Sequence, residues 1–213
     1  MTVPKALAVD VGGTFTDLVG WDGEQLLAGK VPSTPADQSA GVIDGALDMA
    51  IEADRFLHGT TVATNALLQG KGAVTGLVTT AGFSDVIEIG RQDRPSLYDS
   101  FMDRPEPLTP RQLRFDSDEI ASANLKDVAA VAISLLYGYA NPDKEEALAV
   151  VLRERWPHLA ISLSSDVAPE FREFERTATT ILNAYLMPET GSYLRRLRDK
   201  ADAVGLPAAI DVM

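Results

Sequence analysis

The sequence has 213 residues, no cysteine, and 31 acidic against 19 basic residues, which gives a formal net charge of −12. The missing cysteines exclude disulfides, thiolate catalysis and cysteine metal sites, and the acidic balance argues against a nucleic-acid partner. Because no apolar stretch approaches the ~20 residues of a membrane span, and the N-terminus does not resemble a signal peptide, we expect a cytoplasmic protein that binds no membrane.

The first quarter of the chain predicts three short strands and a helix. The strands are expected at residues 6–11, 15–21 and 25–31. Gly12-Gly13 should form the first turn, and Asp22-Gly23 is a signal for a two-residue hairpin. An antiparallel meander is therefore expected at the N-terminus. Pro35 should open a helix that continues to about Ala53.

The rest of the chain alternates between helix and strand patterns. Helices are expected at residues 61–68, 141–155 and 173–204, and strands at 74–79, 128–136, 160–163 and 208–213. Residues 89–114, punctuated by prolines, should be mostly irregular, and Pro188 should break or kink the last helix. Strands that alternate with helices after a meander predict an α/β domain with a ribonuclease-H-like mixed sheet. Since the chain stops inside a strand-like run, we expect a truncated sequence.

The most informative motif begins at Asp10. Gly12 and Gly13 let the backbone turn sharply and approach a ligand, and Thr14 and Thr16 place hydroxyls and amides at the same turn, where phosphate oxygens can be held. A carboxylate at the strand end, that of Asp10, can bind Mg²⁺ directly or through water. The alternative is that the two glycines only form a hairpin. The motif is neither a Walker loop nor a dinucleotide fingerprint.

Residues 10–17 resemble the first phosphate-binding hairpin of the actin/sugar-kinase/heat-shock ATPase superfamily. Four further segments are similar to the hydantoinase/5-oxoprolinase A family, at residues 58–66, 79–85, 89–98 and 169–185. These matches occur in the family's order between residue 7 and the end of the chain. The sequence therefore resembles the N-terminal region of that family.

The resemblance implies an actin-like ATPase fold with an inserted or partial second subdomain, and ATP and Mg²⁺ as cofactors. Similar proteins couple ATP hydrolysis to opening a cyclic amide such as 5-oxoproline or a hydantoin, by phosphorylating its carbonyl oxygen. Related subunits serve acetone- and acetophenone-type carboxylases, and a non-catalytic module of the same fold is a third possibility. A hydantoinase B-type subunit is the implied partner, and a homo-oligomer is possible.

The resemblance also implies a domain division and two departures. Residues 1–185 would be the family's N-terminal domain, and residues 186–213 the start of the next, whose second phosphate loop and adenosine pocket lie beyond the sequence. The chain by itself should therefore show little turnover. Tyr137 and Lys144 stand where the family has histidines, so no imidazole role is carried over, and the segment before Val128 is shorter than usual.

The resemblance assigns site residues by position. Those implied in catalysis are Asp10, His58, Thr60 and Arg91, with Asp10 also the Mg²⁺ ligand; those implied in nucleotide binding are Gly12, Gly13, Thr14, Thr16 and Asp17. Alternatives remain for three of them: His58 as a hydrogen-bonded structural histidine, Thr60 as a helix cap, and Arg91 as a solvated loop arginine. Four charged residues of the last helix, Arg172, Glu173, Glu175 and Arg176, predict weak ion pairs on its face.

Overall fold

The computed structural model describes residues 5–34, 37–49, 52–207 and 209–213. The chain divides into two compact units, one formed by residues 1–70 with 189–213 and the other by residues 71–188. The second unit is thus inserted in the sequence of the first. One long helix, α6 (Glu173–Ala203), contributes residues to both units.

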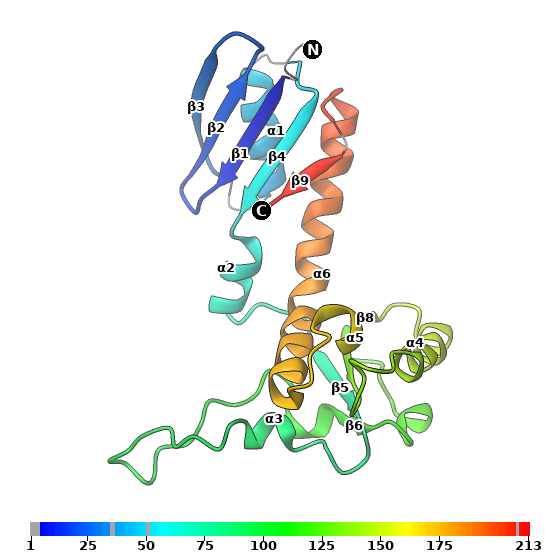
Figure 1. Ribbon diagram of the computed structural model, residues 1–213. Coiled ribbons are helices and arrows are strands. Elements are labelled where there is room, and N and C mark those ends of the chain that lie inside the picture. Colours follow the sequence, from blue (N-terminus) through cyan, green and yellow to red (C-terminus); the bar gives the residue numbers. More distant parts are fainter. Residues whose placement is uncertain (1–4, 35–36, 50–51, 208) are drawn as a thin grey trace. The chain divides into compact units, whose positions relative to one another are not determined.

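The first unit is built on a five-stranded mixed sheet (Figure 1). Its strands are β1 (Ala6–Val11), β2 (Phe15–Trp21), β3 (Leu26–Pro32), β4 (Arg55–Thr60) and β9 (Ile210–Val212), in the spatial order β3-β2-β1-β4-β9. The first three strands pair antiparallel, whereas β4 runs parallel to β1 and β9 runs parallel to β4. This ribonuclease-H-like order confirms the predicted meander and the predicted fold class.

Two helices cover one face of this sheet with apolar side chains. The alternation of β1 buries Leu7, Val9 and Val11 and leaves Asp10 exposed on the other face. The buried residues pack against α1 (Gln38–Asp48) and against the C-terminal part of α6. A second short helix, α2 (Val62–Leu68), directly follows β4. The strand period of two therefore separates a core face from a face that presents polar groups.

Two local predictions differ from the structure, and one strand was not predicted. The β2–β3 loop has four residues, because the Asp22 carboxylate accepts hydrogen bonds at 2.8 Å from the amides of Glu24 and Gln25 and holds a wider turn. The helix α1 ends at Asp48, before the expected Ala53, and its predicted start at Pro35 lies outside the described residues. Strand β4 was too short to assign from its apolar residues alone.

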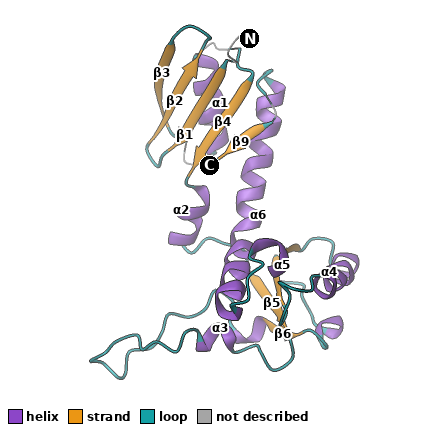
Figure 2. Cartoon of the chain, viewed as in Figure 1, coloured by secondary structure: helices purple, strands orange, loops and turns teal. Residues whose placement is uncertain are grey.

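The second unit contains a four-stranded parallel sheet (Figure 2). Its strands are β5 (Thr75–Thr79), β6 (Arg114–Asp116), β7 (Ala130–Ser134) and β8 (Ala160–Leu163), in the order β6-β5-β7-β8. Its shorter helical elements are α3 (Val86–Ile89), η1 (Arg111–Leu113), η2 (Ile120–Ser122), α4 (Asp143–Arg155) and α5 (Ser164–Val167). The predicted second subdomain is therefore present, and the strands predicted near 74, 128 and 160 are confirmed.

Residues 90–110 form the long irregular loop that the prolines predict. The last helix does not break at Pro188 but continues from Glu173 to Ala203. The expected domain boundary at residues 185 and 186 falls inside this helix, and that division remains a prediction. Among the described residues, no helix combines the length and the apolar character needed to cross a membrane.

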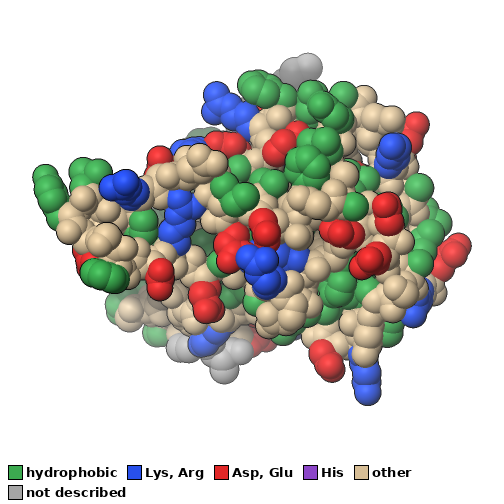
Figure 3. Space-filling model, turned by 90° about the horizontal axis from the view of Figure 1, so that it is seen from below, with side chains coloured by type: hydrophobic (Ala, Val, Ile, Leu, Met, Phe, Trp, Pro, Cys, Tyr) green, Lys and Arg blue, Asp and Glu red, His purple; other side chains and the backbone are tan. Residues whose placement is uncertain are grey.

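Charged side chains of both signs are interspersed on the face of the molecule drawn in Figure 3. Lysine and arginine side chains lie among acidic ones and do not merge into one basic surface there. This mixture of signs on the drawn face agrees with a composition of 31 acidic and 19 basic residues.

Candidate functional site

The site predicted from sequence lies at the carboxyl end of β1. Asp10 is exposed and is paired in register with Asp17 of β2 and with Gly59 of β4. A side chain at position 59 would displace the Asp10 carboxylate from its present position, because a Cβ on Gly59 would lie 2.7 Å from Oδ1 of Asp10. Gly59 thus makes the room in which the carboxylate of Asp10 lies, on the polar face of the sheet.

The turn after β1 is fixed by backbone and hydroxyl hydrogen bonds. The amide of Gly12 donates to the carbonyl of Phe15 at 3.0 Å, and a Cβ on Gly12 would meet that carbonyl at 2.9 Å. Ser33 holds the turn from outside: its hydroxyl donates to the Gly12 carbonyl at 2.8 Å, and its amide donates to the carbonyl of Thr14 at 2.9 Å. Sequence reasoning did not identify Ser33, since no local signal links it to a turn 20 residues earlier.

The residues assigned to nucleotide binding do not all face the same way. Gly13 and Thr14 are exposed, and a Cβ on Gly13 would have no atom within 4 Å. Thr16, by contrast, is 1% exposed, and its hydroxyl lies 3.1 Å from that of Ser33. Asp17 is exposed and forms an ion pair at 2.9 Å with Lys30. The open part of the turn is therefore Gly13-Thr14, whereas Thr16 supports it from the buried side.

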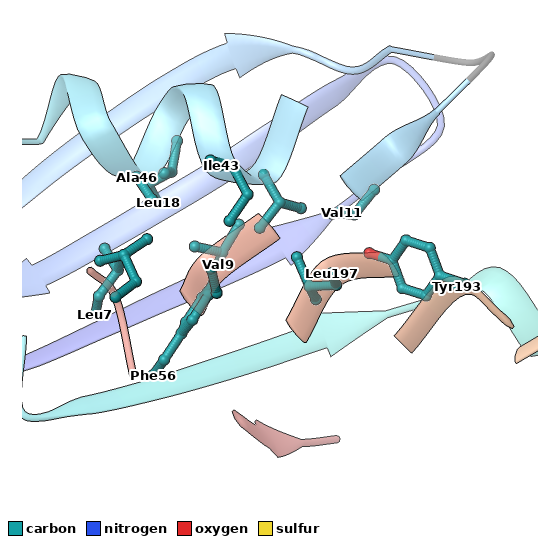
Figure 4. Packing of buried hydrophobic residues seen from close by; sticks show 12 residues of the cluster. Leu7, Val9, Val11, Leu18, Ile43, Ala46, Phe56, Tyr193 and Leu197 are labelled. Atoms are coloured by element: carbon teal, nitrogen blue, oxygen red, sulfur yellow. The ribbon is translucent and has the colours of Figure 1, made fainter. Parts of the chain in front are cut away.

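His58 lies inside the core of the first unit, with 1% of its surface exposed. Its Nδ1 lies 3.2 Å from the carbonyl of Val9, which can only accept, so Nδ1 carries the proton. Its Nε2 then accepts from the hydroxyl of Tyr193 in α6 at 2.8 Å. Figure 4 shows Tyr193 among the buried residues of this core. His58 therefore has the contacts of a hydrogen-bonded structural histidine and does not face the exposed turn.

Burial sets the protonation of this pair. Desolvation lowers the pKa of His58 below its ordinary value of 6.5, against the opposing effects of the Val9 carbonyl and the Asp10 charge. Desolvation also raises the pKa of Tyr193 to about 12, although a hydrogen bond with Thr60 lowers it. Both side chains are therefore neutral near pH 7, which matches the hydrogen-bond directions between them.

Thr60 connects the end of β4 to the start of α2. Its hydroxyl accepts a hydrogen bond at 3.2 Å from the amide of Val62, the first residue of α2. The hydroxyl of Thr61 donates to the carbonyl of Val11 at 3.4 Å. The two threonines thus hold the β4–α2 turn against the end of β1: Thr61 is the N-cap residue, and the hydroxyl of Thr60 bonds the first amide of the helix.

Arg91 belongs to the second unit. Its guanidinium forms an ion pair with Glu175 at 2.8 Å, and this hydrogen bond lowers the pKa of Glu175. Arg91 also lines a cavity of about 850 Å³ beside the long loop, where Arg104 donates to the carbonyls of Ile89 and Asp93. In this structure the Arg91 side chain is thus engaged within its own unit.

Sequence reasoning missed a buried polar network in the second unit. Arg176 was expected in a surface ion pair, but it is 1% exposed and donates to Ser164, to the carbonyls of Leu135 and Glu170, and to Glu173. Glu145 is fully buried, and its carboxylate accepts from Leu135, Ser164 and Ser165. The predicted helix-face ion pair of Arg176 with Glu173 is present, but Arg176 is buried and the pair is part of this larger network. Arg176 is buried because it lies on the helix face next to the sheet, and local sequence does not reveal which face that is.

Comparison with known proteins matches residues 6–126 to the hydantoinase/oxoprolinase N-terminal region. An uncharacterised protein of Methanocaldococcus jannaschii is 35% identical over 100% of this chain and 35% of its own length. The caprolactamase subunit alpha of Pseudomonas jessenii is 33% identical over 90% of this chain and 32% of its own. The acetophenone carboxylase gamma subunit of Aromatoleum aromaticum is 31% identical over 96% of this chain and 34% of its own length.

The fold is shared with solved structures. The crystal structure of the ATP-dependent caprolactamase from Pseudomonas jessenii matches 97% of this chain and 35% of its own with a TM-score of 0.83 and 30% identity. The chain thus spans about a third of the length of these relatives. Together with the sheet order, this likeness establishes the actin-like ATPase fold expected from sequence.

Proposed function

The chain belongs to the hydantoinase/oxoprolinase N-terminal family, and we propose that it is the nucleotide-binding part of an ATP-dependent cyclic-amide hydrolase. In this proposal ATP phosphorylates the carbonyl oxygen of the amide, which turns a poor leaving group into a good one. The similarity to an ATP-dependent caprolactamase supports this substrate class. A B-type partner subunit and a cytoplasmic location are parts of the same proposal.

The exposed carboxylate of Asp10 beside an open glycine turn is the observation that carries the proposal. Gly13 leaves space for phosphate oxygens to approach the backbone, and Thr14 adds an exposed hydroxyl. Asp10 would hold Mg²⁺ with phosphate and water oxygens, because the described residues contain no cluster of three or more acidic or histidine side chains for a metal. Asp17, on the same sheet face, would add negative charge near the ion.

The other assigned residues have supporting roles in this proposal. His58 and Thr60 would act as positioning residues, since their hydrogen bonds hold the ends of β1 and β4. Thr16 would do the same for the turn through Ser33. A role for Arg91 requires that it exchange Glu175 for an anionic ligand, as an arginine fork can do.

The similarity to a carboxylase subunit supports a second candidate, a subunit of an acetone- or acetophenone-type carboxylase. Both candidates need the same phosphate turn, so this turn does not distinguish them. Their products do. Assays of the complete protein with 5-oxoproline, a hydantoin or caprolactam should release a ring-opened amino acid in the first case. Ketone-dependent consumption of bicarbonate with ATP would favour the second.

The proposal is tested by replacing Asp10 in the complete protein with its partner subunits. Asp10→Asn keeps the shape and removes the charge, so turnover should fall by about 100-fold or more while the thermal midpoint is retained. Gly13→Val should instead weaken nucleotide binding, because it places bulk where phosphate must approach. Asp44→Asn, an exposed carboxylate of α1, is the matched control.

An active and normally folded Asp10→Asn protein would remove Asp10 from the site.

A nucleotide titration of the 213-residue chain tests the third candidate, a non-catalytic module. No binding of ATP with Mg²⁺ at millimolar concentration, by either the chain or the complete protein, would favour that module over both enzymes. The chain by itself is expected to show no steady turnover.

A further inference from the structure

The second unit contains a cavity at the carboxyl ends of its parallel strands. The order β6-β5-β7-β8 means that the chain leaves β5 toward one edge of the sheet and leaves β7 toward the other. Connections that diverge in this way open a crevice between the two strands, where ligands bind in open α/β sheets. A cavity of about 610 Å³ lies there, lined by Thr80 after β5, by Ser117 and Asp118 after β6, and by residues 135–137 after β7.

One face of α4 forms the apolar wall of this cavity. The helix contributes Lys144, Ala147, Leu148 and Val151, which are spaced three and four residues apart and so share one face. The neighbouring face, with Glu145, Ala149 and Leu152, is buried in the core. Val151 is 45% exposed, so the cavity wall presents apolar surface that nothing in this unit covers.

The cavity carries two charges of opposite sign. Lys144 and Asp118 both line it, and neither takes part in an ion pair among the described residues. Asp118 accepts only a hydrogen bond at 3.2 Å from the Ser117 hydroxyl within the described part of the chain. A ligand with one positive and one negative group on a small apolar skeleton would satisfy both charges.

A strained residue lies at the same cavity. Tyr137 lines it with φ of +61°, a left-handed conformation that non-glycine residues rarely adopt, and its side chain is 62% exposed. The Leu136 amide beside it donates to the Thr80 hydroxyl at 2.9 Å, which joins the β7 and β5 loops. Residues in such conformations persist only where the surrounding structure holds them, and they are found more often at ligand sites than elsewhere.

We propose that this cavity binds a small amino acid, with the carboxylate at Lys144, the ammonium group at Asp118 and the apolar part against Leu148 and Val151. The volume of about 610 Å³ lies in the ordinary range of ligand pockets and is more than sufficient for a small amino acid. All its lining residues belong to residues 71–188, so none of them is part of the phosphate turn at residues 10–17. The proposal therefore does not depend on the proposed hydrolase activity.

Calorimetric titration of the full 213-residue chain without nucleotide tests this inference. The probes are L-leucine and 6-aminohexanoate, which carry both charges, and 4-methylpentanoate and isoamylamine, which each lack one. We expect at least one amino acid to bind, and each single-charge probe to bind about tenfold more weakly or not at all. Binding of L-leucine would indicate a site for α-amino acids, and binding of 6-aminohexanoate a site for ω-amino acids.

Variants assign the binding to this cavity. Lys144→Ala and Asp118→Asn should each weaken amino-acid binding about tenfold, whereas Lys126→Ala, which removes an exposed lysine of the same unit, should not. Ala147→Phe should block binding by filling the cavity. The inference is overturned if neither amino acid binds at up to about 10 mM, if 4-methylpentanoate binds as well as the amino acids, or if binding survives both charge variants.

Discussion

Arg176 shows how far a buried charge depends on its partners. Its guanidinium is surrounded by two backbone carbonyls, the Ser164 hydroxyl and the carboxylate of Glu173, and its cation lies 5.4 Å from the ring centre of Tyr139. Ser164 also donates to Glu145, so the buried acid and base share one hydroxyl. A charge out of water is tolerated only with such partners.

At the residue scale, this network yields a stability prediction. Arg176→Met should lower the free energy of unfolding by about 3–5 kcal/mol, because it leaves buried carbonyls and Glu173 without their donor. Arg172→Met, at the exposed residue just before α6, should change it by less than about 0.5 kcal/mol. Denaturant unfolding of both variants measures the difference. Equal effects would show that the buried hydrogen bonds of Arg176 contribute no more to stability than an exposed arginine does.

Residues whose chemistry is local could be predicted from sequence. Asp10 and Gly12 lie in one turn, and their pattern indicated both the conformation and the exposed carboxylate. Gly59 and Ser33 could not be assigned a role, because each acts on that turn from another strand or loop. Long-range partners of this kind are invisible to a pattern that extends over a few residues.

At the scale of elements, the His58–Tyr193 hydrogen bond joins β4 to α6 across 135 residues of sequence. Both groups are buried, and the rings lie 5.7 Å apart between centres. The neutral imidazole donates to Val9 and accepts from Tyr193, so protonation would place a hydrogen on Nε2, reverse the bond to the Tyr193 hydroxyl and bury a positive charge.

This contact predicts a pH dependence of stability. The pKa of His58 is lowered in the folded state, so below about pH 6.5 the unfolded chain takes up a proton that the folded chain does not. Stability should therefore fall as the pH decreases below 6.5, until the folded-state pKa is reached. His58→Gln, which cannot titrate, should lose less stability between about pH 7 and pH 5.5.

His158, the other histidine of the sequence, supplies the control for this prediction. It is exposed, with Nε2 3.2 Å from the carbonyl of Val128, and His158→Gln should keep the pH dependence of the parent. Thermal melting of the three proteins across this pH range is the measurement. Parallel curves for the parent and His58→Gln would contradict the prediction.

Most elements could be predicted because their apolar pattern extends over many residues, or because glycine, proline or a capping residue stands at their ends. Strand β8 and the helix α4 were expected almost at their observed bounds. Strand β4 was not assigned, since its sequence contains Arg55, His58 and Gly59 and offers only two consecutive apolar residues. Its strand conformation comes from parallel pairing with β1 on one side and β9 on the other, which is a tertiary effect.

At the scale of the whole molecule, the order of the elements along the chain was predictable. That the C-terminal residues belong to the first unit was not. Residues 189–213 complete the core and the sheet of the first unit after an insertion of more than a hundred residues. Hydrophobic periods indicate which face of α6 is apolar, yet they do not indicate which sheet it covers. The pairing of β9 with β4 is therefore a property of the assembled fold.

The net charge of −12 predicts how the whole molecule responds to salt. Like charges repel one another more strongly in a compact chain than in an expanded one, so the repulsion destabilises the folded state. Increasing the ionic strength from about 10 mM to about 150 mM shortens the screening length from about 30 Å to about 8 Å. The thermal midpoint should rise, because exposed ion pairs such as Lys30–Asp17 contribute little that salt could remove. Glu24→Lys with Glu154→Lys, both exposed, changes the net charge from −12 to −8, since each substitution removes one negative charge and adds one positive charge. This variant should show a smaller rise in the midpoint. A midpoint that falls with salt in the parent would mean that attractive pairs outweigh the net repulsion.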